Sequence, residues 1–126
     1  MKITAFNPII ITKDADALIA LFEALGFERR HKKTGINDED ISAVDMKHPD
    51  GFRISVVKAD KIPQDMTSIR MNVRDLDEAL AFFNERGFTN AQGEKITDTG
   101  SSRATMVVSP SGFTISVSQH IREEDK

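Results

Sequence analysis

The sequence repeats itself: the segment GFRISVV, which begins at Gly51, returns as GFTISVS from Gly112. A shift of 61 residues (112 − 51) aligns residues 7–58 with residues 68–119 without a gap and gives thirteen identities. The identities include two Gly-Phe pairs, one proline and two aspartates in each copy. A self-match of this length indicates that one structural unit has been duplicated, which constrains the fold more than any single motif does.

Each copy predicts the same order of elements. A short apolar segment is followed at once by Asp14 or Asp75, and this residue type is favoured as a helix N-cap. Apolar residues at helical spacing come next, and the helix is expected to end at Gly26 or Gly87, where glycine favours a left-handed C-cap. The remainder predicts three strands, so each copy is β-α-β-β-β. In the first copy the strands are predicted at Pro8–Thr12, from Phe27, at Ala43–Lys47 and at Phe52–Val57, with a loop at Thr34–Asp40. In the second copy they are predicted at Ile69–Val73, from Phe88, at Ala104–Val108 and at Phe113–Ser118, with a loop at Thr97–Ser102.

The repeat sets the expected domain organisation. One unit of about 60 residues is marginal alone, because its sheet has a helix on one face and nothing on the other. We therefore expect a single domain, 1–126, with pseudo-twofold symmetry and a concavity between its halves. Its parts are predicted as a first module at 1–58, a linker at 59–66, a second module at 67–119 and a polar tail at 120–126.

Composition excludes several classes of function. The net charge is −3, and lysine and arginine are scattered, so nucleic acid is not an expected partner. The absence of cysteine excludes disulfides, thiolate metal sites and a cysteine nucleophile. We find no signal peptide and no run long enough to span a bilayer, and we expect no membrane partner and a cytoplasmic location.

The duplicated pattern resembles the vicinal oxygen chelate superfamily, which includes glyoxalase I, ring-cleaving dioxygenases and bleomycin-resistance proteins. The resemblance rests on two tandem βαβββ units, each with an Asp-led helix ending at Gly-Phe and a closing strand written P-x-G-F-x-I-x-V. It covers Asn7 to Gln119. The resemblance implies an α+β fold with a cupped, eight-stranded mixed sheet and helices on its outer face. In enzymes of this family the cup holds a divalent metal.

The resemblance also implies where metal ligands would stand. The family takes them from the first strand of each unit, seven residues before the aspartate, and from each closing strand, four residues after the glycine. These positions hold Asn7, Ser68, Ser55 and Ser116 in this chain, where relatives carry His, Glu or Gln. One amide and three hydroxyls bring no charge, so they offset little of the cost of dehydrating a dication. We therefore expect no metal and no other cofactor.

Strand alternation predicts which other side chains line the cup. If Ser68 faces it, Arg70 and Asn72 do so too, while their apolar neighbours pack under a helix. The same argument places Phe52, Ile54 and Val56, and their counterparts Phe113, Ile115 and Val117, under the helices. The predicted ligand-binding set is Asn7, Ile9, Ile11, Arg53, Ser55, Ser68, Arg70, Asn72, Thr114 and Ser116.

No catalytic residue is predicted. The serines of the predicted set lack a nearby histidine and a nucleophile-elbow motif. His31, His48 and His120 fall outside the predicted cup positions and are expected in solvent.

Three functions stay open. The preferred one is a glyoxalase/bleomycin-resistance-like protein that binds a small polar or anionic organic molecule in its cup, with Arg70 and Arg53 as candidates for gripping a carboxylate or phosphate. An alternative is a lyase, isomerase or dioxygenase-like enzyme of the same superfamily, with or without a metal. The last is a structural dimerisation module with a vestigial pocket. Because family members often pair, we expect a homodimer.

Overall fold

The chain folds as two compact units, which we describe separately. The computed structural model describes residues 1–33, 42–98, 100 and 102–120, with residues 31–33 as backbone only. The first unit is Asn7–Ser68, and the second unit is Ile69–Lys126 together with Met1–Phe6. The predicted loop Thr34–Asp40 and most of the predicted polar tail lie outside the described residues.

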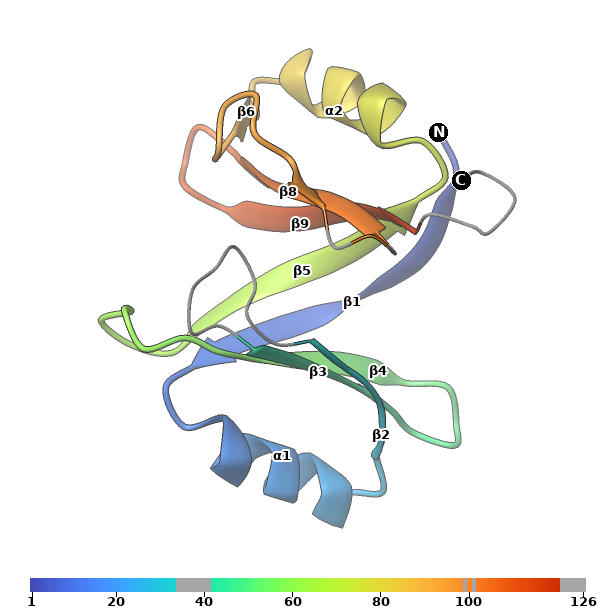
Figure 1. Cartoon of the computed structure of the whole chain (residues 1–126), viewed down its shortest axis with the longest axis vertical. Helices are drawn as coiled ribbons and strands as arrows, with labels where there is room; N and C mark the ends of the chain where they lie inside the picture. The colour runs from blue at the N-terminus through green and yellow to red at the C-terminus, as the bar shows by residue number, and fades with distance from the viewer. Residues whose placement is uncertain (34–41, 99, 101, 121–126) are drawn as a thin grey trace. The chain divides into compact units, whose positions relative to one another are not determined.

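Nine strands and two helices are present among the described residues (Figure 1). They follow the predicted order, except that a ninth short strand, Thr97–Asp98, lies in the segment predicted as the loop Thr97–Ser102. The α+β class and the tandem βαβββ order are confirmed. The first copy supplies β1 (Ile3–Thr12), α1 (Ala15–Ala24), β2 (Glu28–Lys33), β3 (Ser42–Lys47) and β4 (Arg53–Lys58). The second copy supplies β5 (Met66–Val73), α2 (Leu76–Asn84), β6 (Thr89–Asn90), β7 (Thr97–Asp98), β8 (Ser102–Val108) and β9 (Thr114–His120).

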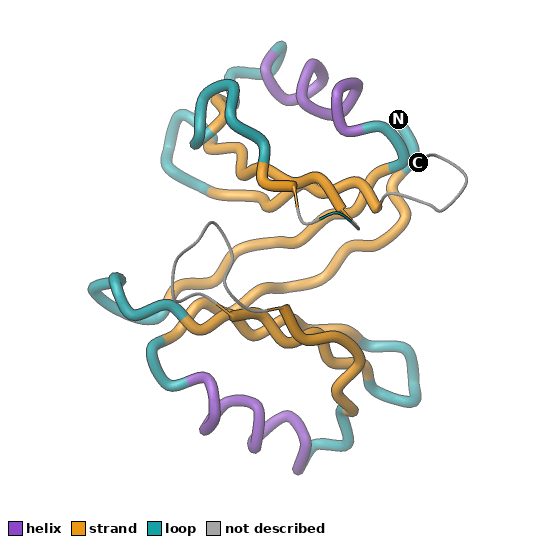
Figure 2. Tube along the Cα trace, in the orientation of Figure 1, coloured by secondary structure: helices purple, strands orange, loops and turns teal. Residues whose placement is uncertain are grey.

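Both units have a mixed sheet of the same design. In the first unit the strand order is β2-β3-β4-β1, and in the second it is β5-β9-β8-β6, with β7 also pairing with β8. The opening strand of each copy runs parallel to its closing strand, as β1 does to β4 and β5 to β9. The other pairs are antiparallel. Each helix covers one face of its own unit's sheet (Figure 2).

The helices start and stop where the sequence predicts. The Asp14 carboxylate accepts a hydrogen bond from the Ala17 N–H at 3.3 Å, and the Asp75 carboxylate accepts one from the Glu78 N–H at 3.1 Å. Each bond satisfies one of the N–H groups that a helix leaves unpaired at its start. Gly26 and Gly87, just beyond the helix ends, have φ values of 101° and 89°, which a residue with a Cβ rarely adopts.

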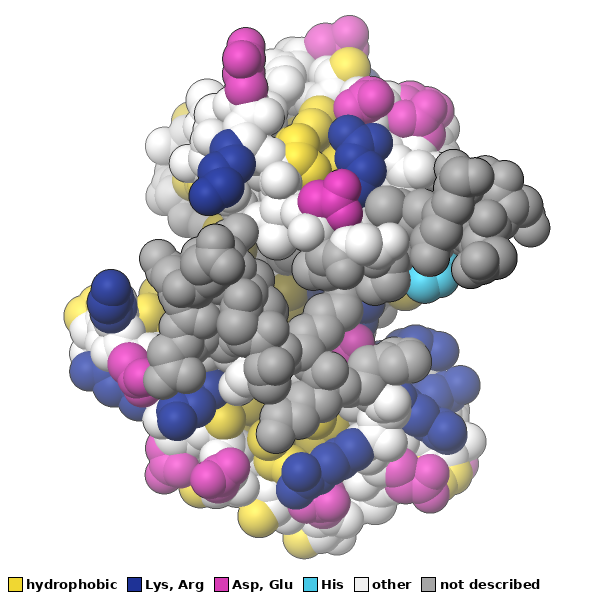
Figure 3. Space-filling view, in the orientation of Figure 1, with side chains coloured by type: hydrophobic (Ala, Val, Ile, Leu, Met, Phe, Trp, Pro, Cys, Tyr) yellow, Lys and Arg dark blue, Asp and Glu magenta, His cyan; other side chains and the backbone are white. Residues whose placement is uncertain are grey.

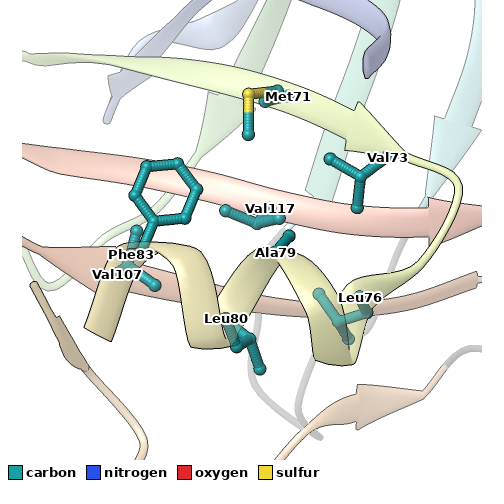
Figure 4. Close-up of a cluster of buried hydrophobic side chains, with 8 residues drawn as sticks. All are labelled: Met71, Val73, Leu76, Ala79, Leu80, Phe83, Val107 and Val117. Atoms are coloured by element: carbon teal, nitrogen blue, oxygen red, sulfur yellow. The ribbon is translucent and has the colours of Figure 1, made fainter. Parts of the chain in front are cut away.

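Each unit has its own apolar core between helix and sheet. In the second unit α2 contributes Leu76, Ala79, Leu80 and Phe83, which form one buried cluster with side chains of β5, β8 and β9 (Figure 4). In the first unit Ala15 and Ile19 of α1 pack against β3 and β4. Strand alternation therefore assigns one face of each sheet to its helix and leaves the other, which we call the helix-free face. The sheet residues of the two cores are Val44, Met46, Ile54 and Val56, and Met71, Val73, Val107 and Val117.

Two residues predicted to lie under the helices do not. Phe52 and Phe113 keep 64% and 46% of their surface exposed, so that prediction is wrong for both. The closing strands begin one residue later than expected, at Arg53 and Thr114, which leaves each phenylalanine in the preceding turn. Its carbonyl oxygen closes that turn, 2.8 Å from the amide nitrogen four residues earlier.

The first six residues pack with the second unit rather than with their own repeat. The Lys2 carbonyl accepts a hydrogen bond from the Arg74 N–H at 3.1 Å. The amino group of Met1 lies 3.0 Å from a carboxylate oxygen of Glu78 in α2. The sequence predicted the first strand only from Pro8, so this extension of β1 was missed.

Neither described helix is long or apolar enough to cross a membrane. On the surface that Figure 3 shows, basic and acidic side chains of the described residues are interspersed.

Candidate functional site

The helix-free face of the first unit gathers polar side chains from three strands. Ile9 of β1 lies beside Ser55 of β4, and Ser55 lies opposite Asp45 of β3. Because paired residues point to the same side of a sheet, the three form a row across the strands. Asn7, two residues before Ile9, points to the same side and reaches this row with its side chain.

Asn7, Ser55 and Asp45 are joined by hydrogen bonds. The Asn7 Nδ2 donates to Ser55 Oγ at 3.1 Å, and Ser55 Oγ donates to an Asp45 carboxylate oxygen at 2.8 Å. Asn7 and Ser55 are only 3% and 2% exposed, and Asp45 is half-buried. Buried hydrogen bonds that end on a charged group are the stronger ones in proteins, so this chain of three residues is held in one arrangement.

The carbonyl oxygen of Asn7 is buried without a hydrogen-bond partner among the described residues. The unpaired atom is assigned as the oxygen, not the nitrogen, because of the hydrogen bonds that the other atom of the amide makes. Nδ2 also donates to the Pro8 carbonyl oxygen at 2.9 Å, and a carbonyl oxygen only accepts. Flipping the amide would set two oxygens against each other, so the unpaired atom is an acceptor.

The helix-free face of the second unit has a row at the same position with different chemistry. Arg70 of β5 lies beside Ser116 of β9, and Ser116 lies opposite Met106 of β8. In the next row, Ser118 Oγ donates to the Asn72 side-chain oxygen at 2.6 Å. Arg70, Asn72, Ser116 and Ser118 are all half-buried. This face therefore offers a cation, an amide and hydroxyls.

The structure divides the predicted ligand-binding residues between the two units. Asn7, Ile9, Ile11, Arg53, Ser55 and Ser68 belong to the first unit, and Arg70, Asn72, Thr114 and Ser116 belong to the second. Ser68 is buried, whereas Arg53 is exposed and lies opposite Lys47. The joint cup formed by all ten residues stays a prediction.

The four positions that the family resemblance assigns to metal ligands do not suit a divalent ion. Asn7 and Ser55 bond to each other, and with Ser68 and Ser116 they supply only neutral oxygen and nitrogen. Among the described residues, no three His, Cys, Asp or Glu side chains come together in a way that would hold a metal. A dication needs several charged or imidazole ligands to offset its lost hydration, and Asp45 alone adds one carboxylate to this set.

The histidines do not contribute to either row through any described side chain. His48 was predicted in solvent, but it is packed between Phe27 and Phe52, with ring centroids 5.3 and 5.7 Å away. Its Nδ1 accepts a hydrogen bond from the Asp50 N–H at 3.0 Å, so it acts as a turn residue. His120 is exposed at the end of β9. The backbone of His31 pairs with that of Asp45.

Asp45 was not among the predicted site residues, although the sequence carries a signal for it. The HPDG turn joins β3 to β4, and antiparallel pairing across a turn of that length sets position 45 opposite position 55. Counting back from the serine through the hairpin would have placed a carboxylate beside it.

Comparison with solved structures identifies the fold. A methylmalonyl-CoA epimerase from Mycobacterium tuberculosis matches with a TM-score of 0.77 and 16% identity, covering 97% of this chain and 91% of that one. The Streptomyces coelicolor methylmalonyl-CoA epimerase in complex with 2-nitronate-propionyl-CoA matches with a TM-score of 0.73 and 15% identity over 96% of this chain and 100% of that one. A glyoxalase/bleomycin resistance protein/dioxygenase superfamily member from Vibrio splendidus 12B01 matches with a TM-score of 0.61 and 18% identity over 94% and 99%.

No family model and no curated protein sequence matches the chain. At identities of 15–18% the structural matches establish the fold and leave the activity open. The resemblance found in the sequence is therefore confirmed at the level of architecture: the chain has the vicinal oxygen chelate fold of the glyoxalase and bleomycin-resistance superfamily.

Proposed function

We propose that this protein binds a small polar or anionic organic molecule on the helix-free faces of its sheets and needs no divalent metal to do so. The observation that carries the proposal is the position of Arg70. It lies beside Ser116, one of the family's ligand positions, and it is half-buried on a face that no helix of its unit covers.

The chemistry around Arg70 favours an anion. A guanidinium presents several N–H donors in one plane and grips a carboxylate or phosphate with two parallel hydrogen bonds. Partial burial strengthens such a bond, because the surrounding dielectric is lower than in water. Ser116 and Thr114 add hydroxyls along the neighbouring strand, and hydroxyls serve a ligand as donors or acceptors.

The relatives suggest a first ligand class to test. One solved epimerase holds methylmalonyl-CoA, and another holds 2-nitronate-propionyl-CoA. We propose acyl-CoA thioesters that carry an acidic group on the acyl chain as probes for this chain. Methylmalonyl-CoA has a free carboxylate, and propionyl-CoA is the same molecule without it, so the pair isolates the contribution of the charge.

The experiment is calorimetric titration of both thioesters into the wild type and two variants. The chain lacks tryptophan and tyrosine, so intrinsic fluorescence does not report binding. The wild type is expected to bind methylmalonyl-CoA more tightly than propionyl-CoA. Arg70→Ala should weaken methylmalonyl-CoA binding about tenfold or more and abolish the preference, since a hydrogen bond to a charged group contributes roughly 1.5–3 kcal/mol.

The matched control is Arg103→Ala. Arg103 belongs to the same unit, but its guanidinium lies 3.8 Å from the Asp77 carboxylate of α2, on the helix side of the sheet. This variant should bind both thioesters as the wild type does. Equal affinity of the wild type and Arg70→Ala for methylmalonyl-CoA, or a wild type that binds neither thioester, would refute this ligand class.

An enzymatic role is the second candidate, and Asp45 is the observation that favours it. The Asp45 carboxylate is half-buried and lies 2.8 Å from a serine hydroxyl, and a carboxylate in such a setting is suited to act as a general base. Incubating methylmalonyl-CoA with the protein in D₂O tests this, because an isomerase or epimerase exchanges the hydrogen next to the thioester carbonyl. Deuterium uptake that Asp45→Asn abolishes would establish catalysis, and no uptake above the uncatalysed rate would leave binding as the function.

We also propose that the protein forms a homodimer in the cytoplasm. Phe6, Phe52 and Phe113 are exposed, and large apolar side chains at a surface are common where subunits meet. Light scattering on the eluting peak of a sizing column should give twice the chain mass. A single chain's mass at micromolar concentration would contradict the proposed dimer.

A further inference from the structure

We infer that the carbonyl oxygen of Asn7 is a recognition point for an O–H or N–H donor group of a small molecule at the first unit. This deepens the proposed function, since it names what the ligand presents there. It does not depend on the acyl-CoA class or on Arg70.

The position of the oxygen is fixed before any ligand binds. Nδ2 of the same amide is committed to the Pro8 carbonyl and to Ser55, so the amide plane is held at two points. The oxygen at its other corner is buried and unpaired among the described residues. Leaving a buried acceptor unpaired costs folding free energy, and a group kept in that state signals a missing partner.

The surrounding groups define the chemistry of that partner. Ser55 directs its only proton to Asp45, so it has none to give to Asn7. The two atoms that end this chain are an amide oxygen and a carboxylate, and both accept hydrogen bonds. A ligand group that is itself only an acceptor would be repelled here, whereas a hydroxyl or an ammonium group would be bound.

The second unit holds an internal comparison. The side-chain oxygen of Asn72 also lies on a helix-free face, but it accepts a hydrogen bond from Ser118 at 2.6 Å. Asn72 therefore has its acceptor satisfied within the chain, while the Asn7 oxygen has no partner in the part of the chain that the structure describes. The response of an unpaired and a paired amide oxygen to a donor ligand can therefore be compared in one sample, because each side-chain amide gives its own signals in a nitrogen-15 spectrum.

The test uses three probes of nearly equal shape, followed through the assigned side-chain amide signals. Acetone offers only an acceptor, 2-propanol offers a hydroxyl donor, and isopropylammonium chloride offers a charged donor. We expect saturable shifts at Asn7 with both donors and an apparent affinity for 2-propanol about fivefold above that for acetone, which corresponds to one neutral hydrogen bond. Asn72 should show no such preference. Sodium chloride at matched strength controls for salt.

The Asp45→Asn variant tests the role of the carboxylate while keeping an acceptor for Ser55. It should weaken the isopropylammonium ion by about fivefold or more and leave 2-propanol within twofold, because a charge acts on the cation alone. A merely structural role of Asp45 would weaken both probes alike, which would remove Asp45 from the site.

Two results would overturn the inference itself. One is an acetone response at Asn7 equal to that of 2-propanol, and the other is the absence of any saturable shift at Asn7 with all three probes. Either result leaves the Arg70 test untouched, and a failure of the thioester titrations likewise leaves this one intact.

Discussion

The two units share a scaffold and differ in what their helix-free faces present. The turn before each closing strand is repeated almost atom for atom: Gly51 N–H to His48 O spans 2.8 Å, and Gly112 N–H to Ser109 O spans 2.9 Å. The central row of the face, by contrast, reads Ile9, Ser55 and Asp45 in one unit and Arg70, Ser116 and Met106 in the other. Duplication has kept the serine and exchanged its neighbours, so the cation and the acid lie in different copies.

The cores differ as well, and the largest expected effect follows from that. Leu76 begins α2 fully buried, where α1 begins with the smaller Ala15. Leu76→Ala should lower the free energy of unfolding by about 3 kcal/mol, because it removes most of a fully buried side chain and leaves a cavity in the core. Urea denaturation followed by circular dichroism measures this. A decrease in the free energy of unfolding below about 1 kcal/mol would contradict this, because it would mean that the second unit repacks around an alanine at the start of its helix, as the first unit does around Ala15.

The paired serines should respond unequally. Ser55→Ala removes one hydrogen bond from Asn7 and one from Asp45, both in a buried setting, and should cost about 2 kcal/mol. Ser116 is half-buried, and its hydroxyl makes no hydrogen bond within the described part of the chain. Ser116→Ala should therefore change stability by less than about 0.5 kcal/mol. Equal losses in the same urea assay would show that the two faces are not as different as their contacts indicate.

A substitution at Thr105 should raise the stability of the protein, whereas the changes above lower it. Its hydroxyl is buried without a partner among the described residues, on the helix side of the second sheet, where the repeat places Val44 in the first. Thr105→Val keeps the shape and removes the unpaired group, so it should stabilise the protein by about 1 kcal/mol. The reverse change, Val44→Thr, should destabilise it. A raised melting temperature for the first variant and a lowered one for the second would confirm the comparison, and two losses would contradict it.

The helix caps should show the smallest difference between the units. Asp14 and Asp75 cap their helices through the same bond, and each substitution by alanine should cost about 0.5–1 kcal/mol. Thermal unfolding of the two variants measures both. A loss at one position more than twice that at the other would show that the caps are not equivalent.

Local signals in the sequence predicted most of the scaffold. The aspartate caps, the Gly-Phe helix ends and the closing strands depend on neighbouring residues, and these were placed correctly apart from the first residue of each closing strand. The N-terminal extension of β1 onto the second unit was missed, because it depends on contacts with residues more than seventy positions away, such as Arg74 with Lys2. Phe52 was misplaced because β4 begins only at Arg53, so the alternation that holds for Ile54 and Val56 does not extend to a residue in the turn.

The candidate site was predictable in part. Alternation placed Asn7, Ser55, Arg70 and Ser116 away from the helices, and the structure agrees for each. Alternation does not report hydrogen bonds, so it did not indicate that Ser55 would bond to Asp45 or that the Asn7 oxygen would have no partner among the described residues. Those facts depend on side-chain direction, which a pattern of residue types does not contain.

The central claim is that neutral groups occupy the four positions that the family resemblance assigns to the ligands of a divalent ion. Thermal denaturation of chelator-treated protein with Mn²⁺, Co²⁺, Ni²⁺ and Zn²⁺, repeated on Ser55→Ala, tests it most directly, because an ion held only by the folded state raises the melting temperature. We expect no saturable rise with any of the four ions. A rise that saturates at one equivalent in the wild type and is lost in Ser55→Ala would contradict the account.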